Sequence, residues 1–155
     1  MEFKWKDIFN TLKGFCKTKK EEESMDTPLF TLEGREFDAK VVKIYDGDTI
    51  HVVFPFKGEV TRWKIRMEGY DSPEIKSKNQ EEKKAANVAK EALANKIGEN
   101  RVKLVCGKFD KYGRLLGTIF LGDDNINTWM ISEGYGYPYD GGTKMIFEPP
   151  SVMIN

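Results

Sequence analysis

The chain has 155 residues, a length that suits a single domain with a hydrophobic core. Hydrophobic residues make up 39% and charged residues 32%, which excludes wholesale disorder, and two cysteines and one histidine exclude a disulfide-rich scaffold and a multi-histidine metal site. Lysine and arginine number 25, as do aspartate and glutamate, which excludes a globally basic nucleic-acid binder but leaves room for a local basic face.

Residues 1–17 carry the pattern of an amphipathic helix. The apolar side chains that recur at helical spacing are Phe3, Trp5, Ile8, Phe9, Leu12, Phe15 and Cys16. Lysines dominate the other face, so the alternatives are docking onto the domain and association with a membrane surface or an acidic partner. Charged residues follow, and we predict a helix and linker over residues 1–28. Residues 1–20 lack the apolar stretch of a secretion signal, so we expect an intracellular protein.

The pattern then changes to that of a folded domain, which we place at residues 29–145, with a C-terminal tail at 146–155. Residues 37–45, 49–54 and 59–67 are rich in β-branched and aromatic side chains and are separated by turn residues. This arrangement predicts three antiparallel strands.

The second half of the domain predicts a helix, two strands and a short helix. Ser77 to Gln80 has the spacing of a capping box, which predicts a helix through Ile97 with Gly98 at its stop. Its expected buried stripe is Ala85, Ala89, Ala92, Leu93 and Ile97. Residues 101–105 and 115–121 predict two further strands, the first ending at Cys106, which we expect to be a buried thiol.

Residues 123–125 have the composition of a helix cap, and the short helix they open ends at Gly134. The aromatic and glycine-rich segment 135–143 predicts no regular secondary structure. The whole pattern indicates an α+β fold, and five short strands are the number that a small OB-type barrel needs.

Three short motifs contain the residues best suited to chemistry. Asp46-Gly-Asp-Thr49 lies at a turn between two predicted strands, Arg66-Met-Glu-Gly-Tyr-Asp-Ser-Pro-Glu74 runs off the third strand, and Asp110-Lys-Tyr-Gly-Arg114 lies in a later loop. Each motif alone is ordinary turn or helix-start chemistry. Only their combination points to a site.

The combination supplies the parts of a phosphodiester-hydrolysing site. Asp48, Asp71 and Glu74 offer hard oxygen ligands, which suit Ca²⁺ or Mg²⁺ rather than zinc. Arg66 and Arg114 offer guanidinium forks that match a phosphate and keep their charge. A divalent cation neutralises the phosphate, a carboxylate acts on water, and arginines stabilise the developing charge.

In this order and with a helix between the second and third, the motifs resemble those of the staphylococcal-nuclease-like (thermonuclease) family over about residues 37–140. The resemblance implies a five-stranded OB-type β-barrel with three helices. It also implies a Ca²⁺-dependent hydrolase, an endonuclease that cleaves single-stranded DNA and RNA and leaves 3′-phosphate ends. Asp48 and Asp71, with the backbone carbonyl of Ser72, then resemble the metal ligands, although serine stands here where threonine is usual.

The resemblance also assigns the remaining roles. Glu74 resembles the residue that acts on the attacking water, and Arg66 and Arg114 resemble the catalytic arginines on the scissile phosphate. Lys111, Tyr112 and Tyr139 are candidates for substrate contact; for the tyrosines, packing against the barrel is the alternative. The basic side chains near the motifs, expected to form a salt-dependent phosphate-attracting rim or simply a solvated surface, are Arg62, Lys64, Lys76, Lys78, Lys83, Lys84, Lys108 and Lys111.

The leading hypothesis is therefore a monomeric nuclease with Ca²⁺ as cofactor and DNA and RNA, preferably single-stranded, as partners. The alternative is a catalytically silent OB-type module that binds nucleic acid or protein, since folds are reused without their chemistry. Tethering to a membrane surface through residues 1–17 is compatible with either.

Overall fold

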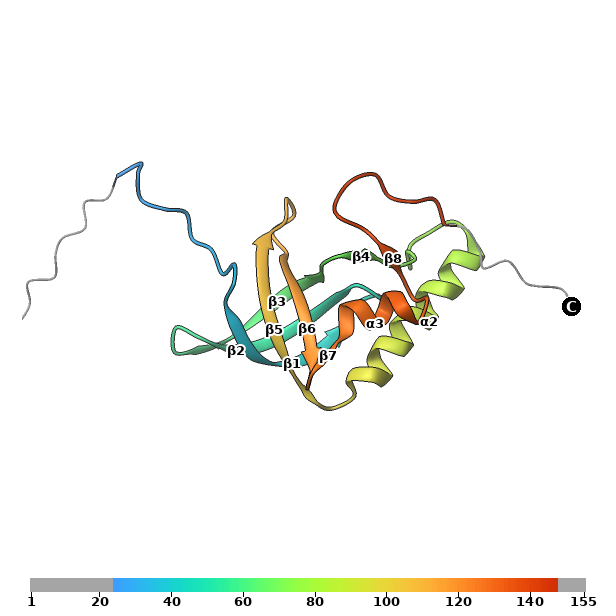
Figure 1. The fold of residues 1–155 in the computed structure, drawn as a ribbon, viewed down its shortest axis with the longest axis horizontal. Helices are drawn as coiled ribbons and strands as arrows, with labels where there is room; N and C mark the ends of the chain where they lie inside the picture. Colours follow the sequence, from blue (N-terminus) through green and yellow to red (C-terminus); the bar gives the residue numbers. More distant parts are fainter. Residues whose placement is uncertain (1–23, 148–155) are drawn as a thin grey trace, which may run out of the picture. The chain divides into compact units, whose positions relative to one another are not determined.

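The computed structural model describes residues 24–147, so the amphipathic helix predicted for residues 1–17 lies outside the described residues. The body is built from β1 (Glu36–Ile44), β2 (Thr49–Phe56), β3 (Glu59–Met67), β5 (Arg101–Phe109) and β6 (Leu115–Leu121). These five strands pair antiparallel in the order β3-β2-β1-β5-β6, and β3 closes onto β6 in parallel (Figure 1). The predicted five-stranded barrel in an α+β fold is confirmed.

Strand alternation decides what the barrel buries. On β2, Ile50, Val52 and Phe54 point inward and are at most 1% exposed, while the residues between them face outward. The tight β2–β3 hairpin turns at Lys57 and Gly58, both with positive φ, as a two-residue hairpin of this twist requires. Cys106 is 3% exposed in the same core, as expected, and burial raises its pKa to about 11.

Two helices are present in residues 24–147, α2 (Gln80–Ile97) and α3 (Ile126–Ser132), where the resemblance implied three. The region after α3 contains Gly136, Pro138, Gly141 and Gly142, which disfavour a helix there. Figure 1 shows α2 and α3 at the same end of the barrel. Neither helix of the described residues is long and apolar enough to span a membrane.

The start of α2 differs from the prediction. Asn79, not Ser77, is the N-cap: its side chain accepts hydrogen bonds from the amides of Glu81 and Glu82, at 2.9 and 3.4 Å. Ser77 instead accepts from the amide of Asn79 at 3.1 Å and shapes the preceding turn. The helix stops at Gly98 as predicted.

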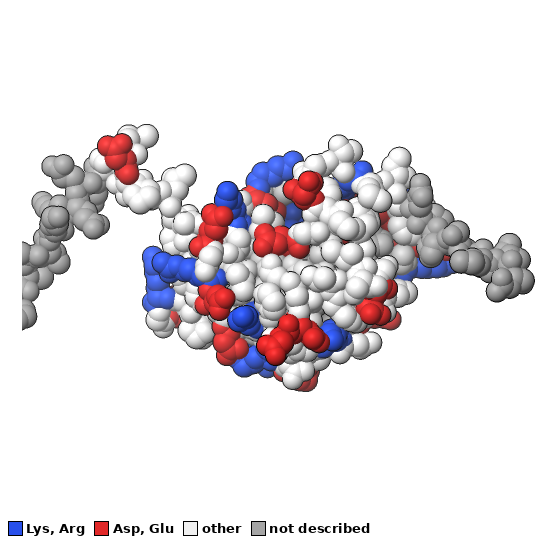
Figure 2. Space-filling model, in the orientation of Figure 1, with Lys and Arg blue, Asp and Glu red and all other residues white. Residues whose placement is uncertain are grey.

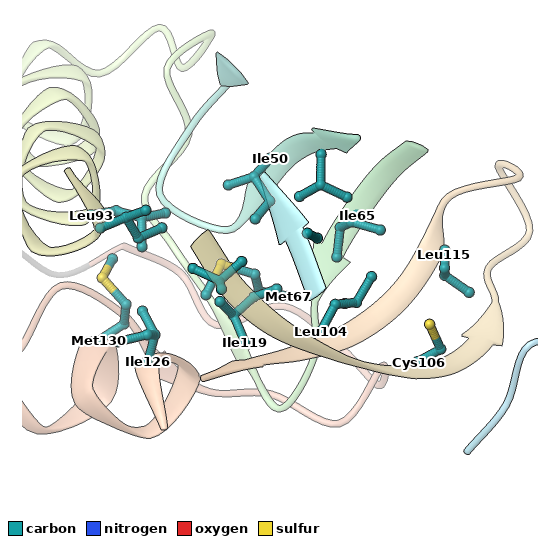
Figure 3. Close-up of a cluster of buried hydrophobic side chains, with 14 of the residues drawn as sticks. Ile50, Ile65, Met67, Leu93, Leu104, Cys106, Leu115, Ile119, Ile126 and Met130 are labelled. Atoms are coloured by element: carbon teal, nitrogen blue, oxygen red, sulfur yellow. The ribbon is translucent and has the colours of Figure 1, made fainter. Parts of the chain in front are cut away.

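Both helices contribute one apolar face to the core. The buried residues of α2 are Ala86, Ala89, Leu93 and Ile97, so the predicted positions Ala85 and Ala92 lie only at the edge of that face. Figure 3 shows Leu93 of α2 and Ile126 and Met130 of α3 facing the strand side chains. The helices therefore cap the barrel and fix the segments that run from it.

Three two-residue strands complete the fold: β4 (Tyr70–Asp71), β7 (Asp124–Asn125) and β8 (Tyr137–Pro138). β8 pairs antiparallel with β4, so the prediction that the whole of residues 135–143 is irregular is wrong at this point. The approach is close, because a Cβ on Gly136 would lie 2.6 Å from Tyr70 Cδ2 and 2.8 Å from the Asp71 carbonyl oxygen. Pairing across this distance in sequence brings the C-terminal segment to the end of β3.

Candidate active site

A cleft of about 1290 Å³ opens where β3 ends and the chain continues through β4 toward α2. A typical small-molecule pocket is roughly 300–1,000 Å³, so this cleft has room for part of a polymer. Every site residue predicted from the sequence lines it: Asp48, Arg66, Asp71, Ser72, Glu74, Lys111, Tyr112, Arg114 and Tyr139. The fold thus brings the three motifs together.

Arg66 joins the two buried aspartates. It lies near the end of β3 on the outward-facing side, opposite Thr49 of β2. Its Nη2 lies 2.6 Å from Asp71 Oδ1 and 3.3 Å from Asp48 Oδ2, and its Nη1 donates to the Met67 carbonyl at 2.7 Å. Burial raises the pKa of Asp48, and the Arg66 guanidinium opposes this rise. One guanidinium therefore compensates two carboxylates that burial would otherwise destabilise.

The turn that carries Asp48 is held from several sides. Asp48 Oδ2 accepts from both the amide and the hydroxyl of Ser72 at 3.0 Å, and Oδ1 accepts from the Thr49 hydroxyl at 2.9 Å. The hydroxyl of Tyr70 donates to the Gly47 carbonyl at 2.6 Å. A Cβ on Gly47 would lie 2.9 Å from Ala89 of α2 and from Ser72, so only glycine lets the turn approach this closely.

The C-terminal segment supplies a second set of contacts. Lys144 Nζ lies 2.8 Å from Glu74 Oε1 and 3.1 Å from Asp71 Oδ2, and the Tyr137 hydroxyl donates to Asp71 Oδ2 at 2.9 Å. In Figure 1 the chain beyond β8 turns back in a wide loop. Partial burial lowers the pKa of Lys144, but hydrogen bonds to Glu74 and Asp71 outweigh it and raise that pKa. Burial and the bond to Asp71 raise the pKa of Tyr137 to about 12, so both groups act as donors.

The third motif forms a loop ordered by Asp110. This carboxylate accepts from the amides of Tyr112 and Arg114 at 2.9 Å and from Arg114 Nε at 2.7 Å. Burial raises the pKa of Asp110, but the hydrogen bonds from Arg114 more than offset this and lower it overall. Arg114 Nη1 lies 3.4 Å from the Thr49 hydroxyl. The Arg114 guanidinium is thereby directed toward the residue that pairs with Arg66.

Two of the candidate substrate contacts are placed at the rim. Tyr112 is 72% exposed, with the Arg114 guanidinium 5.6 Å and Lys111 Nζ 5.1 Å from its ring centre. Tyr139 donates its amide hydrogen to the Gly69 carbonyl at 3.0 Å and its hydroxyl to the Gly142 carbonyl at 2.9 Å. Tyr112 is therefore free to stack on a base, whereas Tyr139 stabilises its own loop at the cleft wall.

A metal site does not follow directly from the carboxylates. Among residues 24–147, no three histidine, cysteine, aspartate or glutamate side chains are grouped to hold a metal ion. Glu74 is about half exposed and is linked to Asp71 through Lys144, so the expected set of three carboxylates is not assembled. Asp48 and Asp71 do converge on one positive group, Arg66, and their hard oxygens suit Ca²⁺ in kind. A cation there would draw further ligands from backbone oxygen and water.

Sequence reasoning missed three residues of this site. Asp110 belongs to the third motif, but the motif alone does not indicate that its carboxylate orients Arg114. Tyr137 and Lys144 lie 66 and 70 residues from the carboxylates they contact, so no local pattern indicated these contacts, although the aromatic tail that contains Tyr137 loosely resembles the tyrosine-bearing C-terminal segment of the family.

Comparison with known proteins agrees with this geometry. A family model described as "Staphylococcal nuclease homologue" matches residues 64–144. The chain is 32% identical over 118 residues to the thermonuclease of Staphylococcus intermedius, covering 70% of this chain and 66% of that protein. It is 34% identical over 116 residues to an endonuclease of Bacillus subtilis, YhcR, covering 67% of this chain and 9% of the other. An uncharacterized protein of Methanocaldococcus jannaschii is 33% identical over 124 residues, with 64% and 58% covered. The chain thus spans less than two thirds of the length of each of these relatives.

Proposed function

The chain belongs to the family of staphylococcal nuclease homologues, and on that premise we propose that it is a nuclease, a Ca²⁺-dependent phosphodiesterase that hydrolyses single-stranded DNA and RNA. The observation that carries the proposal is the cleft in which Arg66 and Arg114 flank Thr49 beside two buried aspartates. A polyanion is the substrate that such a site suits, because neither arginine can lose its charge.

The two arginines would bind the scissile phosphate. Arg66 approaches from β3 and Arg114 from the loop before β6, so their donors reach the region of Thr49 from two sides. Negative charge on the phosphate oxygens increases as water attacks phosphorus. Fixed guanidinium donors therefore stabilise the transition state more than they stabilise the ground state. Asp110 holds Arg114 in place with its Oδ2, so the donor needs little reorganisation during the reaction.

Glu74 would act on the attacking water. Its carboxylate is half exposed, lines the cleft and lies 2.8 Å from Lys144 Nζ. General bases of this kind contribute about 10²–10⁴-fold to the rate. Bound by Asp48, Asp71 and the backbone carbonyl of Ser72, Ca²⁺ would supply electrostatic neutralisation of the phosphate. Departure of the 5′-oxygen leaves a 3′-phosphate end, an outcome carried over from the family resemblance.

Residues at the rim of the cleft would contact the substrate beyond the scissile phosphate. The ring of Tyr112 is exposed enough to stack on a base, a contact worth about 1–3 kcal/mol. Lys111 lies beside that ring and would supply a phosphate contact, and Tyr139 also lines the cleft. These contacts favour unpaired bases, because a base stacked within a duplex cannot reach an aromatic ring.

The proposal is tested by cleavage of end-labelled single-stranded DNA and RNA with Ca²⁺, with and without chelator. We expect Glu74→Gln to lower kcat by about 10²–10⁴-fold while substrate binding in chelator stays near that of the wild type. Glu99→Gln is the control, because Glu99 is an exposed glutamate just beyond the end of α2. Sensitivity of the product ends to a 3′-phosphatase identifies the bond that breaks.

Strands that bind but are never cut, at any Ca²⁺ concentration, would overturn the nuclease proposal and favour an OB-type binding module. Cleavage that is unaffected by Glu74→Gln would remove Glu74 from the mechanism. Cleavage that persists in chelator would remove Ca²⁺.

A further inference from the structure

Strand β3 carries a row of cationic side chains on its outward face. Ile65 and Met67 point into the barrel and are fully buried, so Arg62, Lys64 and Arg66, which alternate with them, lie on the opposite face. Arg66 is the innermost of the three and ends between the cleft aspartates. At about 3.4 Å per residue, the row from Arg66 to Arg62 extends roughly 14 Å away from the cleft.

The neighbouring strands β2 and β1 add further basic side chains beside this row. His51 of β2 lies opposite Lys64 in the register, and Lys43 of β1 lies opposite His51. Val53 of β2 lies opposite Arg62. Lys43, His51, Lys64 and Arg62 therefore occupy one continuous area of the sheet, which we call the basic strip.

Within the part of the chain that the structure describes, no acidic side chain forms an ion pair with the basic strip. Lys43, Arg62 and Lys64 are exposed, and none of them forms an ion pair with a carboxylate of residues 24–147. Burial, followed by the charges of Arg62, Lys43 and Lys64, lowers the pKa of His51, and every charged group that acts on this ring is positive. On the face of the molecule in view in Figure 2, residues of both signs are mixed.

We propose that the basic strip binds the phosphate backbone of a single nucleic-acid strand on one side of the phosphate held by Arg66. The charge is complementary, and alternate strand positions place successive cations about 7 Å apart along the path that leads out of the cleft. The inference rests on the proposed function for the position of the strand. It adds a second binding site, which gives the enzyme a preference for longer strands.

The test measures binding without cleavage. In chelator, fluorescence anisotropy follows binding of a labelled oligonucleotide of about 12 nucleotides and of a labelled dinucleotide to the full chain and to the double variant Arg62→Gln, Lys64→Gln. We expect the variant to bind the longer strand about ten-fold more weakly at ~0.1 M salt, and the slope of log affinity against log salt to fall by about 1.4. Binding of the short strand, which the cleft alone accommodates, stays unchanged.

The control removes the same charges elsewhere. Arg101 and Lys103 also occupy alternate exposed positions of one strand, β5, and Lys103 lies opposite Phe120, at the end of β6 away from Arg114. Arg101→Gln with Lys103→Gln lowers the net charge equally. Among the described residues, the ion pair it breaks is that of Arg101 with Asp38, which is exposed and contributes little to stability. This control binds both strands like the wild type if position, and not net charge, matters.

A second readout locates the contact. His51 is the only histidine of the chain, so its ring resonance in a proton NMR spectrum needs no assignment by mutation. We expect this resonance to shift as the longer strand is added in chelator and to stay in place with the short one.

Equal affinity and salt slope in the two double variants would overturn the inference, as would a His51 resonance that stays in place at saturation. Strip-dependent binding by a chain that cuts nothing with Ca²⁺ would sink the proposed nuclease function but support the strip. Cleavage of both lengths by the strip variant with wild-type efficiency would support the nuclease function but overturn the inference about the strip. A wild-type chain that binds no strand at all would overturn both.

Discussion

Asn127 connects α3 to the barrel and to the turn that leads into the site. The residue is 5% exposed; its Oδ1 accepts from the Ile119 amide at 3.0 Å, and its Nδ2 donates to the carbonyls of Glu68 and Gly117 at 2.9 and 3.0 Å. Replacement by alanine removes all three hydrogen bonds at once. Since Glu68 directly precedes the β4 turn, the substitution also loosens the segment that carries Asp71.

The expected loss follows from what each partner retains. The Gly117 carbonyl still accepts a hydrogen bond from the Glu68 amide at 3.0 Å, so loss of its hydrogen bond from Asn127 costs little stability. The buried Ile119 amide and the partly buried Glu68 carbonyl lose the partner that Asn127 gave them, at about 1–3 kcal/mol for a fully buried group. Because water can reach Glu68 in part, we expect Asn127→Ala to lower the free energy of unfolding by about 2–4 kcal/mol.

Urea unfolding of the full chain, followed by tryptophan fluorescence, measures this loss. Thr128→Ala is the matched control, because Thr128 is the exposed neighbour on the same helix, and we expect it to change stability by less than about 0.5 kcal/mol. An Asn127→Ala protein within about 0.5 kcal/mol of the wild type would refute the reasoning that these hydrogen bonds are buried and irreplaceable.

Three further predictions concern the site and the strip. Lys144→Met removes a cation that contacts Glu74 and Asp71, so Ca²⁺ should bind the variant, without substrate, about ten-fold more tightly than the wild type. Calorimetry measures this affinity, with Lys108→Met as the control. Equal affinities of the two variants for Ca²⁺ would contradict the prediction. The lowered pKa of His51 means that the fold favours the neutral ring, so wild-type stability should fall relative to His51→Gln as pH drops below the unfolded pKa of about 6.5; a difference that is the same at every pH would show that His51 is not so placed. Gly136→Ala places a Cβ 2.6 Å from Tyr70, so pairing of β8 with β4 should weaken and the melting temperature should fall, whereas Gly142→Ala, whose nearest contact is the Asp140 side chain at 3.3 Å, should have little effect; equal melting temperatures would argue against the close approach.

The strands could be predicted from the sequence because their signals are local, and the barrel and most of the cleft followed from the family that the motifs resemble. Enrichment in β-branched and aromatic residues between turn residues predicted β2 and β3, in which Ile50 and Ile65 are buried. The three motifs, through the family that they resemble, predicted Asp48, Arg66 and Arg114 as residues of one site, and all three line the cleft. Local signals failed where two capping residues competed, so that Asn79 and not Ser77 begins α2.

By itself, then, the sequence determined the strand pattern, the family and the residue types of the candidate site. Only the tertiary structure decided which partners those residues have. Tyr137 and Lys144 reach Asp71 because β8 pairs with β4, a contact that depends on the space left by Gly136. The basic strip likewise exists only in the register of β1, β2 and β3, where side chains distant in sequence come to lie side by side. The physical reason is that such contacts form only when the whole chain closes on itself, so no short stretch of sequence encodes them.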